Sequence, residues 1–305
     1  MFETPILYLI FNRPDLTEIS FQSICSIKPK KLFIAADGPR IDNKLDEINC
    51  ILVREFVISK IDWDCDLKIL FREENLGCGK AVSFAISWFF DQVEYGIILE
   101  DDCVPFNSFF NFCEQLLIKY KNNDRICHIS GCNFQIGHIH NKNDYFFSNY
   151  SFIWGWATWK RSWIHYDFDM IDFESFYKGF KNKNLISYDF YLSVKNKTID
   201  TWDVQWQYAL LKNNKISIQP KLNLIKNIGF LNNATHTTCP EPYFLKISAY
   251  GDLDNKLIHP KKIFINWIAD YFTAYRIYNL KQNRVVNIII NKYFKYFLKK
   301  SIIKL

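Results

Sequence analysis

The sequence predicts an α/β fold in which a mixed, mainly parallel sheet of the Rossmann-like kind is flanked by helices and followed by a helical, basic C-terminal appendage. Three observations support this prediction. Short apolar runs alternate with helix-like segments over the first 130 residues. The runs are almost continuously hydrophobic, which is typical of parallel strands buried on both faces. Lys and Arg accumulate near the C-terminal end.

The predicted elements alternate as a parallel sheet requires. Strands are expected at 5–11, 31–36, 66–71, 96–100 and 126–130, with helices at 14–26, 42–60, 78–92 and 106–120. The helix at 106–120 is indicated by apolar residues at helical spacing. Beyond residue 131 we expect an aromatic segment (148–163), a polar helical stretch to about 195, a helix (201–210) and strands within 216–230.

Charge separates the end of the chain from the rest. Residues 260–305 hold ten Lys or Arg and one Asp, a local charge of +9, whereas the other residues carry 28 basic and 31 acidic groups, or −3. A nucleic-acid-binding protein should have its positive face on the folded body, so this class is excluded. Two interpretations of the basic segment stay open. It forms either a helix lying on anionic lipid or a packed helix pair with a solvated basic face.

Cysteine usage and hydropathy bear on the compartment. The nine cysteines form no C-x-x-C pair, and several lie in apolar runs. This pattern favours free thiols in a reducing compartment over a disulfide framework. No stretch reaches the roughly 18 apolar residues of a membrane-spanning helix, and 5–11 is too short for a signal core. We therefore expect a cytoplasmic protein.

Polar residues follow each of the first four predicted strands. The strand ends read "FNRPD" (11–15), "AADGPR" (35–40), "FREENLGCGK" (71–80) and "EDD" (100–102). In parallel sheets the ligand crevice lies outside the carboxyl ends of the strands. Four such endings in succession predict a built site at this edge.

The acidic triplet in "GIILEDDCVP" (96–105) is the most informative of these endings. Isolated charges are too costly to bury, so the three carboxylates must emerge at the crevice and be offset by a cation. Hard ions such as Mg²⁺ and Mn²⁺ take carboxylate oxygen and leave positions for substrate phosphates. The alternative is a solvated acidic turn that caps a helix starting near Ser108.

Taken together, the motifs resemble those of GT-A fold glycosyltransferases. "FNRPD", "AADGP", "NLGCGKA", "ILEDD", "WGWATW", "WDVQW" and "NIGF…ATHT" occur in the order of that family and cover about residues 5–240. The chain most resembles the N-acetylglucosaminyltransferase family that starts branching of N-linked glycans, with its bacterial relatives. The resemblance implies a donor half (1–130) and an acceptor half (131–240) of one domain, followed by the appendage (241–305).

For the acidic residues, the resemblance implies a metal and donor site. Asp102 would ligate Mn²⁺ or Mg²⁺, while Asp101 and Glu100 would face the ribose and the sugar of the donor. His236, in "NNATHT", would join the metal or touch the diphosphate, unless it is an ordinary loop histidine.

The basic and polar strand ends would hold the nucleotide. The Arg13 fork suits a phosphate or a nucleobase carbonyl, although a surface arginine is the alternative. Asp37 would accept a hydrogen bond from a uracil N–H, or merely form an Asp-Gly turn. Lys80 would approach the nucleotide beside glycines that permit close backbone contact, which a tight turn would explain equally well.

The acceptor half would supply the base and the sugar contacts. The resemblance implies that Asp203 deprotonates the acceptor hydroxyl and that Trp202 lines the donor sugar. The alternative for Asp203 is a carboxylate stabilising a helix N-terminus. Trp154, Gly155 and Trp156 would pack against sugar C–H faces, or belong to a hydrophobic plug. The family has a second Asp where this chain has Val204, so that residue's role is not carried over.

The expected function is an inverting, metal-dependent transfer from a nucleotide-diphosphate sugar, most simply a UDP-sugar, to a free or lipid-linked saccharide. The expected setting is bacterial polysaccharide or lipopolysaccharide assembly, with contact to the anionic cytoplasmic face of the inner membrane. One alternative is a sugar-nucleotide pyrophosphorylase, whose long glycine-rich loop after strand one is missing from "FNRPDLTE". The other is a non-catalytic membrane-peripheral module of the same fold.

Overall fold

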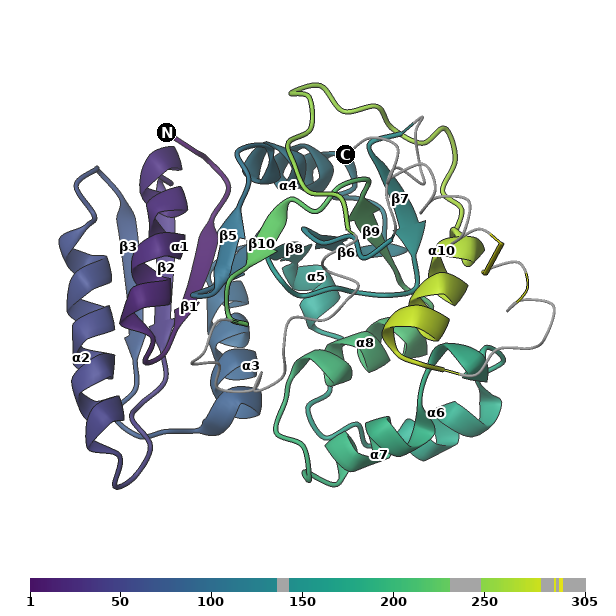
Figure 1. Cartoon of the computed structure of the whole chain (residues 1–305), viewed down its shortest axis with the longest axis horizontal. Coiled ribbons are helices and arrows are strands. Elements are labelled where there is room, and N and C mark those ends of the chain that lie inside the picture. The colour runs from purple at the N-terminus through teal and green to yellow at the C-terminus, as the bar shows by residue number, and fades with distance from the viewer. Residues whose placement is uncertain (136–142, 231–247, 281–287, 289–290, 293–305) are drawn as a thin grey trace.

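The computed structural model describes residues 1–135, 143–230, 248–280, 288 and 291–292. Its centre is an eight-stranded sheet in the order β3-β2-β1-β4-β8-β6-β9-β7, beside a two-stranded sheet of β5 and β10 (Figure 1). The strands are β1 (Ile6–Ile10), β2 (Lys31–Ala36), β3 (Asp66–Phe71), β4 (Tyr95–Glu100), β5 (Cys103–Pro105), β6 (Ile126–Ser130), β7 (Tyr145–Ser148), β8 (Trp156–Trp159), β9 (Ile216–Pro220) and β10 (Ile225–Asn227).

The sheet is mixed and mainly parallel, as the sequence predicts. Strands β3, β2, β1 and β4 run parallel to one another, so their carboxyl ends meet at one edge. Strand β8 enters antiparallel between β4 and β6. Strand β9 runs parallel to β6, and β7 closes the far edge antiparallel to β9.

The predicted helices of the first half are all present, with bounds within two residues of those expected. The α-helices are α1 (Pro14–Ile27), α2 (Lys44–Ser59), α3 (Gly77–Phe90), α4 (Ser108–Lys119), α5 (Lys160–Trp163), α6 (Phe173–Gly179), α7 (Tyr188–Lys195), α8 (Asp203–Lys212) and α10 (Trp267–Phe272). A 3₁₀ turn, η1 (Lys183–Leu185), precedes α7, and a π turn, η2 (Thr273–Ile277), follows α10.

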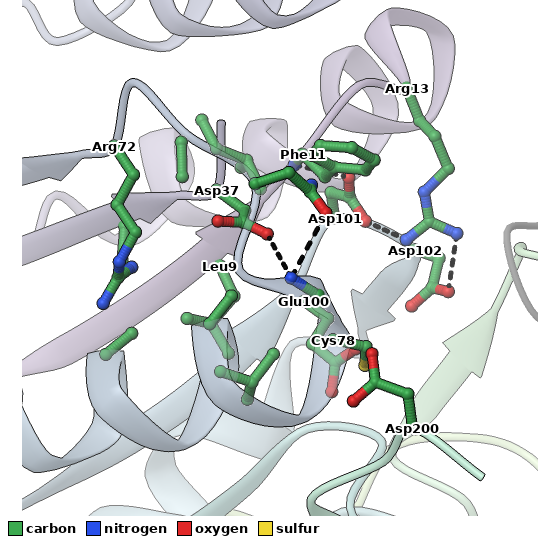
Figure 2. A pocket seen from close by; sticks show the side chains of 18 of the residues that line it. Leu9, Phe11, Arg13, Asp37, Arg72, Cys78, Glu100, Asp101, Asp102 and Asp200 are labelled. Carbon is green, nitrogen blue, oxygen red and sulfur yellow. Dashed lines mark hydrogen bonds and ion pairs between the residues drawn. The ribbon is translucent and has the colours of Figure 1, made fainter. Parts of the chain in front are cut away.

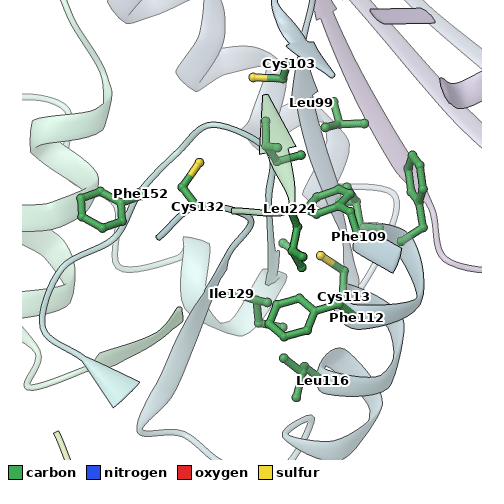
Figure 3. Packing of buried hydrophobic residues seen from close by; sticks show 14 of the residues in the cluster. Leu99, Cys103, Phe109, Phe112, Cys113, Leu116, Ile129, Cys132, Phe152 and Leu224 are labelled. Atoms are coloured by element: carbon green, nitrogen blue, oxygen red, sulfur yellow. The ribbon is translucent and has the colours of Figure 1, made fainter. Parts of the chain in front are cut away.

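Helices cover both faces of the sheet because every buried strand presents apolar side chains in both directions. In β1, Tyr8 packs with α1, α2 and α4, whereas Leu7 and Leu9 pack with α3 and α8. Figure 3 shows the first of these faces, where Phe112 and Leu116 of α4 lie against Ile129 of β6. This double cover is what an almost continuously hydrophobic strand requires.

The described part of the C-terminal segment packs on the sheet domain. Asp270 of α10 accepts hydrogen bonds from Ser148 and Asn149 at the end of β7. The Tyr278 ring stacks on Tyr150 with 5.4 Å between centroids. The predicted boundary at residue 240 and the lysine-rich end (293–305) lie outside the described residues.

Two expectations about the compartment can be compared with the described residues. The eight cysteines among them are free thiols, and Cys239 lies outside this set. In the parts of the chain that the structure describes, no helix has both the length and the hydropathy to cross a bilayer.

Candidate functional site

A cavity of about 440 Å³ lies at the carboxyl ends of β1 to β4. All four polar strand ends contribute to its wall, as expected from parallel strands sharing one edge (Figure 2). Its charged lining residues are Arg13, Asp37, Arg40, Arg72, Glu100, Asp101, Asp102 and Asp200.

Arg13 is ion-paired with two carboxylates of the acidic triplet. It lies between β1 and Pro14, the first residue of α1. Its guanidinium forms an ion pair with Asp101 and a second with Asp102 Oδ2 at 3.1 Å (Figure 2). These carboxylates raise the pKa of Arg13 above its ordinary value despite its burial, so the side chain stays charged. Arg13 therefore supplies part of the positive charge that the triplet requires.

Asp101 is more deeply buried than the other two carboxylates of the triplet. Asp101 is 2% exposed, and burial raises its pKa against the opposing effect of Arg13. Burial also raises the pKa of Glu100, and the negative charge of Asp102 adds to the effect. Glu100 Oε1 is buried without a hydrogen-bond partner among the described residues. The triplet does not cap α4, because the first amide of that helix, at Ser108, donates to Asp252 at 2.7 Å.

A metal ion at Asp102 would need substrate phosphate or water, or residues outside the described part of the chain, to complete its coordination. Its Oδ2 contacts Arg13, and Cys103 Sγ donates to its Oδ1 at 3.4 Å. Within the described part of the chain, no group of three or more His, Cys, Asp or Glu is arranged to hold an ion. His236 lies outside that part. Mg²⁺ commonly binds through one or two carboxylates and substrate phosphates, and the donor set fits this mode.

Asp37 and Arg72 lie at neighbouring strand ends, after β2 and β3. The Asp37 carboxylate accepts hydrogen bonds from the backbone amides of Leu76, at 3.1 Å, and Gly77, at 3.2 Å. Burial raises the pKa of Asp37, and these amides and Arg72 oppose the shift. Asp37 therefore anchors the start of α3 and also faces the cavity.

Sequence reasoning missed Asp200, a single acid in the polar loop before α8. Its Oδ1 accepts a hydrogen bond from Gly79 N at 3.0 Å. A Cβ at Gly77 would stand 2.6 Å from Asp200 Oδ2, and one at Gly79 would stand 2.5 Å from Oδ1. The glycines of "NLGCGK" thus admit this carboxylate. Lys80 is exposed on α3 and is not among the residues lining the cavity.

Asp203, the expected base, is the first residue of α8. Its Oδ1 accepts a hydrogen bond from Thr201 Oγ1, and its side chain accepts none from the backbone amides of its own helix. Asp203 stands close enough to Glu100 to raise the pKa of that carboxyl, yet it is not among the residues lining the cavity. It lies beside the cavity, and Asp200 lies in its wall.

In the aromatic segment (148–163), some side chains line the cavity and others lie in the hydrophobic core. Trp154 lines the cavity beside Phe230. The sugar-facing roles expected for Trp156 and Trp202 do not agree with their positions, since both indoles are buried and stack on each other at 5.6 Å. Gly155 has φ +57°, and a Cβ there would lie 2.5 Å from Ile225 of β10, so packing explains this glycine.

Comparisons with known proteins find only distant structural likenesses. No protein-family model matches the sequence, and no curated protein matches it. HddC from Yersinia pseudotuberculosis is similar with a TM-score of 0.31 and 10% identity over 53% of this chain and 78% of that one. UDP-glucose pyrophosphorylase complexed with UDP-glucose is similar with a TM-score of 0.34 and 9% identity over 73% of this chain and 91% of that one. The function must therefore be argued from the site.

Proposed function

We propose that this chain is a glycosyltransferase that binds a nucleotide-diphosphate sugar, specifically a UDP-sugar. The observation that carries the proposal is a cavity at the carboxyl ends of β1 to β4, which is lined by Arg13 and the triplet as well as by Asp37 and Arg72. Arginine forks match phosphate oxygens, and crevices at this edge are the usual ligand sites of such sheets. The diphosphate would lie at Arg13 and Asp102, and the nucleobase at Asp37.

The proposed chemistry is a single displacement with inversion. Asp203 takes the proton of an acceptor hydroxyl as its oxygen bonds to the anomeric carbon, while the bond from that carbon to the diphosphate breaks on the opposite face. Asp203 Oδ1 accepts from Thr201, and Oδ2 has no hydrogen-bond partner among the described residues, which supports this role. A Mn²⁺ or Mg²⁺ ion held by Asp102, with His236 as a further proposed ligand, would stabilise the charge of the departing diphosphate.

The short connection after β1 favours a transferase over a pyrophosphorylase. Strand β1 ends at Ile10 and α1 begins at Pro14. Only residues 11–13 separate them, so a long glycine-rich loop has no room there. Arg13 instead reaches the triplet from this connection.

The acceptor and the cellular setting belong to the same proposal. The acceptor would be a free or lipid-linked saccharide in bacterial surface-polysaccharide assembly on the cytoplasmic face of the inner membrane. Support comes from the basic residues within 260–305, each of which contributes about 1 kcal/mol to attraction by anionic lipid.

The test is UDP release from UDP-sugars with Mn²⁺ and a saccharide acceptor. Asp102→Asn and Asp203→Asn are each expected to lower the rate, the second by about 10²–10⁴-fold because a general base contributes that much. Asp91→Asn, which alters an exposed carboxylate at the end of α3, is the matched control. Unchanged release in both site variants would favour the non-catalytic module.

A further inference from the structure

Helix α2 is hydrophobic on its outward side as well as on the side that packs on the sheet. The residues buried on the inward side are Asp46, Cys50, Val53 and Val57. The large apolar residues on the outward side, between 36% and 65% exposed, are Leu45, Ile48, Ile51, Leu52 and Ile58. The helix lies at the end of the molecule opposite α10 (Figure 1). A surface helix normally has polar residues on its outer face, so a contiguous apolar face of this kind indicates a partner.

The outward face of α2 has an ordered centre. Lys44, Ile48, Ile51 and Glu55 recur at i, i+4, i+7 and i+11, so they form one row along the helix, and all four are exposed. The apolar residues that border this row are Leu45, Leu52 and Ile58. Lys44 and Glu55 have no ion-pair partner among the residues that the structure describes. The row therefore consists of two isoleucines between two unpaired charges of opposite sign.

This row is complementary to itself in the antiparallel direction. If the α2 helix of a second copy crosses this one antiparallel, with a two-fold axis between residues 49 and 50, Lys44 meets Glu55 of the second copy. Ile48 then meets Ile51 of the second copy, and the symmetry makes each contact occur twice. A parallel pair in register would instead place Lys44 beside Lys44 and Glu55 beside Glu55. Charge complementarity thus selects a second copy of this chain in one orientation.

Other occupants of this surface fit its charges less well. A helix that lies on anionic lipid carries a rim of Lys and Arg, whereas Glu47 and Glu55 are exposed on this side together with Lys44. Pairing through the neighbouring edge strand β3 is opposed by Asp66 and Lys68, because exposed charges on an edge strand discourage strand addition. Helix packing through α2 is the arrangement that uses the apolar residues.

We propose that the outward face of α2 is a homodimer interface in which the α2 helices of two copies pack antiparallel. This inference goes beyond the proposed function and does not depend on it. The residues of the row are not among those lining the cavity, so the interface uses no residue of the candidate site. On the inward side of the same helix, Arg54 donates to the carbonyls of Asp37 and Arg72 at 2.9 and 2.7 Å. The interface is therefore formed by the helix that supports this part of the cavity wall.

The experiment is sedimentation velocity of the full chain over about 1–100 μM, since an interface built on one pair of helices is at the small end of specific complexes. The wild type is expected to form a dimer within this range. Lys44→Glu and Glu55→Lys each bring like charges together at two places in the dimer, and each should weaken it roughly tenfold. The double variant restores both pairs with their signs exchanged and should return to within about threefold of the wild type. Glu94→Lys, at an exposed glutamate outside α2, is the control for charge reversal.

A second variant tests the apolar centre of the interface. Ile48→Glu puts a charge at the middle of the contact and should weaken the dimer by about a hundredfold or more, which leaves a monomer over the whole range. Ile118→Glu is the matched control, because Ile118 of α4 is 59% exposed and Ile48 is 56% exposed. All the replaced side chains are exposed, so the thermal unfolding of dilute samples, followed by circular dichroism, should stay close to that of the wild type.

Each outcome decides the proposal. A wild type that remains monomeric up to the highest concentration would overturn it, and so would a dimer that persists in Ile48→Glu. If both single charge reversals weaken the dimer and the double variant does not recover, the antiparallel arrangement is wrong. The oligomeric state leaves the proposed function untouched, because that proposal is tested by UDP release.

Discussion

Asp270 makes the stability of the folded chain depend on pH in a defined direction. Its side chain is fully buried, its Oδ1 accepts from Ser148 at 2.6 Å, and its Oδ2 accepts from the Asn149 backbone and side chain. Burial outweighs these bonds and raises the pKa of Asp270 to about 6. An unfolded aspartate has a pKa of about 3.9, so the folded state binds the proton more tightly. Ionisation therefore favours unfolding.

The size of the effect follows from linkage. A shift of about two pKa units corresponds to about 3 kcal/mol, present in full below the unfolded pKa and lost as pH rises through about 6. Between pH 4.5 and 7.5 the change is about 2 kcal/mol, because part of the loss occurs at lower pH. Asp270→Asn removes the titration. The wild type should therefore lose about 2 kcal/mol of stability relative to this variant over that interval.

The assay is urea unfolding of the wild type and Asp270→Asn at a series of pH values. Taking the difference between the two proteins cancels the titration of all other groups. Asp254→Asn, which changes an exposed carboxylate of the same segment, is the matched control. A wild-type-minus-variant difference that is flat with pH, or that grows as pH rises, would refute the assignment of the shift to burial.

Three further predictions concern the cavity wall. Arg13→Met removes the cation paired with Asp101, whose side chain is only 3% exposed, and should lower the free energy of unfolding by about 3–5 kcal/mol. Urea unfolding measures this loss, and Arg125→Met, at an exposed arginine, should leave the stability unchanged. Gly79→Ala puts a Cβ 2.5 Å from Asp200 Oδ1 and 2.8 Å from the Thr201 carbonyl oxygen, so it should destabilise the folded protein by about 1–3 kcal/mol. Gly179→Ala is the control, because a Cβ there meets no atom within 4 Å and should not destabilise the protein. Burial and the nearby Glu100 and Asp200 raise the pKa of Cys78, so iodoacetamide at pH 8 should label it more slowly in the native than in the unfolded protein, as read by peptide mass spectrometry. Equal rates in the two states would contradict that environment.

Most elements of the first 130 residues were predictable, whereas strands β5, β7 and β8 and the strand order across the sheet were not. Strands 31–36, 66–71 and 126–130 match β2, β3 and β6 residue for residue, because short, mainly apolar runs bounded by polar loops leave little freedom. Nothing in the sequence indicated that β8 would insert antiparallel between β4 and β6. That pairing is set by contacts between distant segments, which a local pattern does not contain.

The residues of the candidate site also include some that the sequence predicts and some that it does not. The positions of Arg13, Asp37 and the triplet at one edge follow from strand direction alone. The sequence could not assign Trp156 and Trp202 because an indole suits a sugar face and a hydrophobic core equally well. Only the packing of one against the other distinguishes the two positions. Asp200 was missed because an acid in a polar loop is ordinary. Its partners at Gly77 and Gly79 are far away in sequence.

The start of α3 connects the end of β2 with the loop before α8 through hydrogen bonds. A helix N-terminus attracts anions, and a glycine-rich stretch before it commonly holds phosphate. Here the amides of Leu76 and Gly77 are bonded to Asp37, and that of Gly79 to Asp200. Because carboxylates of the protein already take these donors, the diphosphate of the proposed donor would be held elsewhere, at Arg13 and the triplet. The same bonds join the loop before α8 to the end of β2. A change at Asp200 should therefore shift Asp203 relative to Asp37, so the proposed transfer would depend on this helix start even without a ligand contact there.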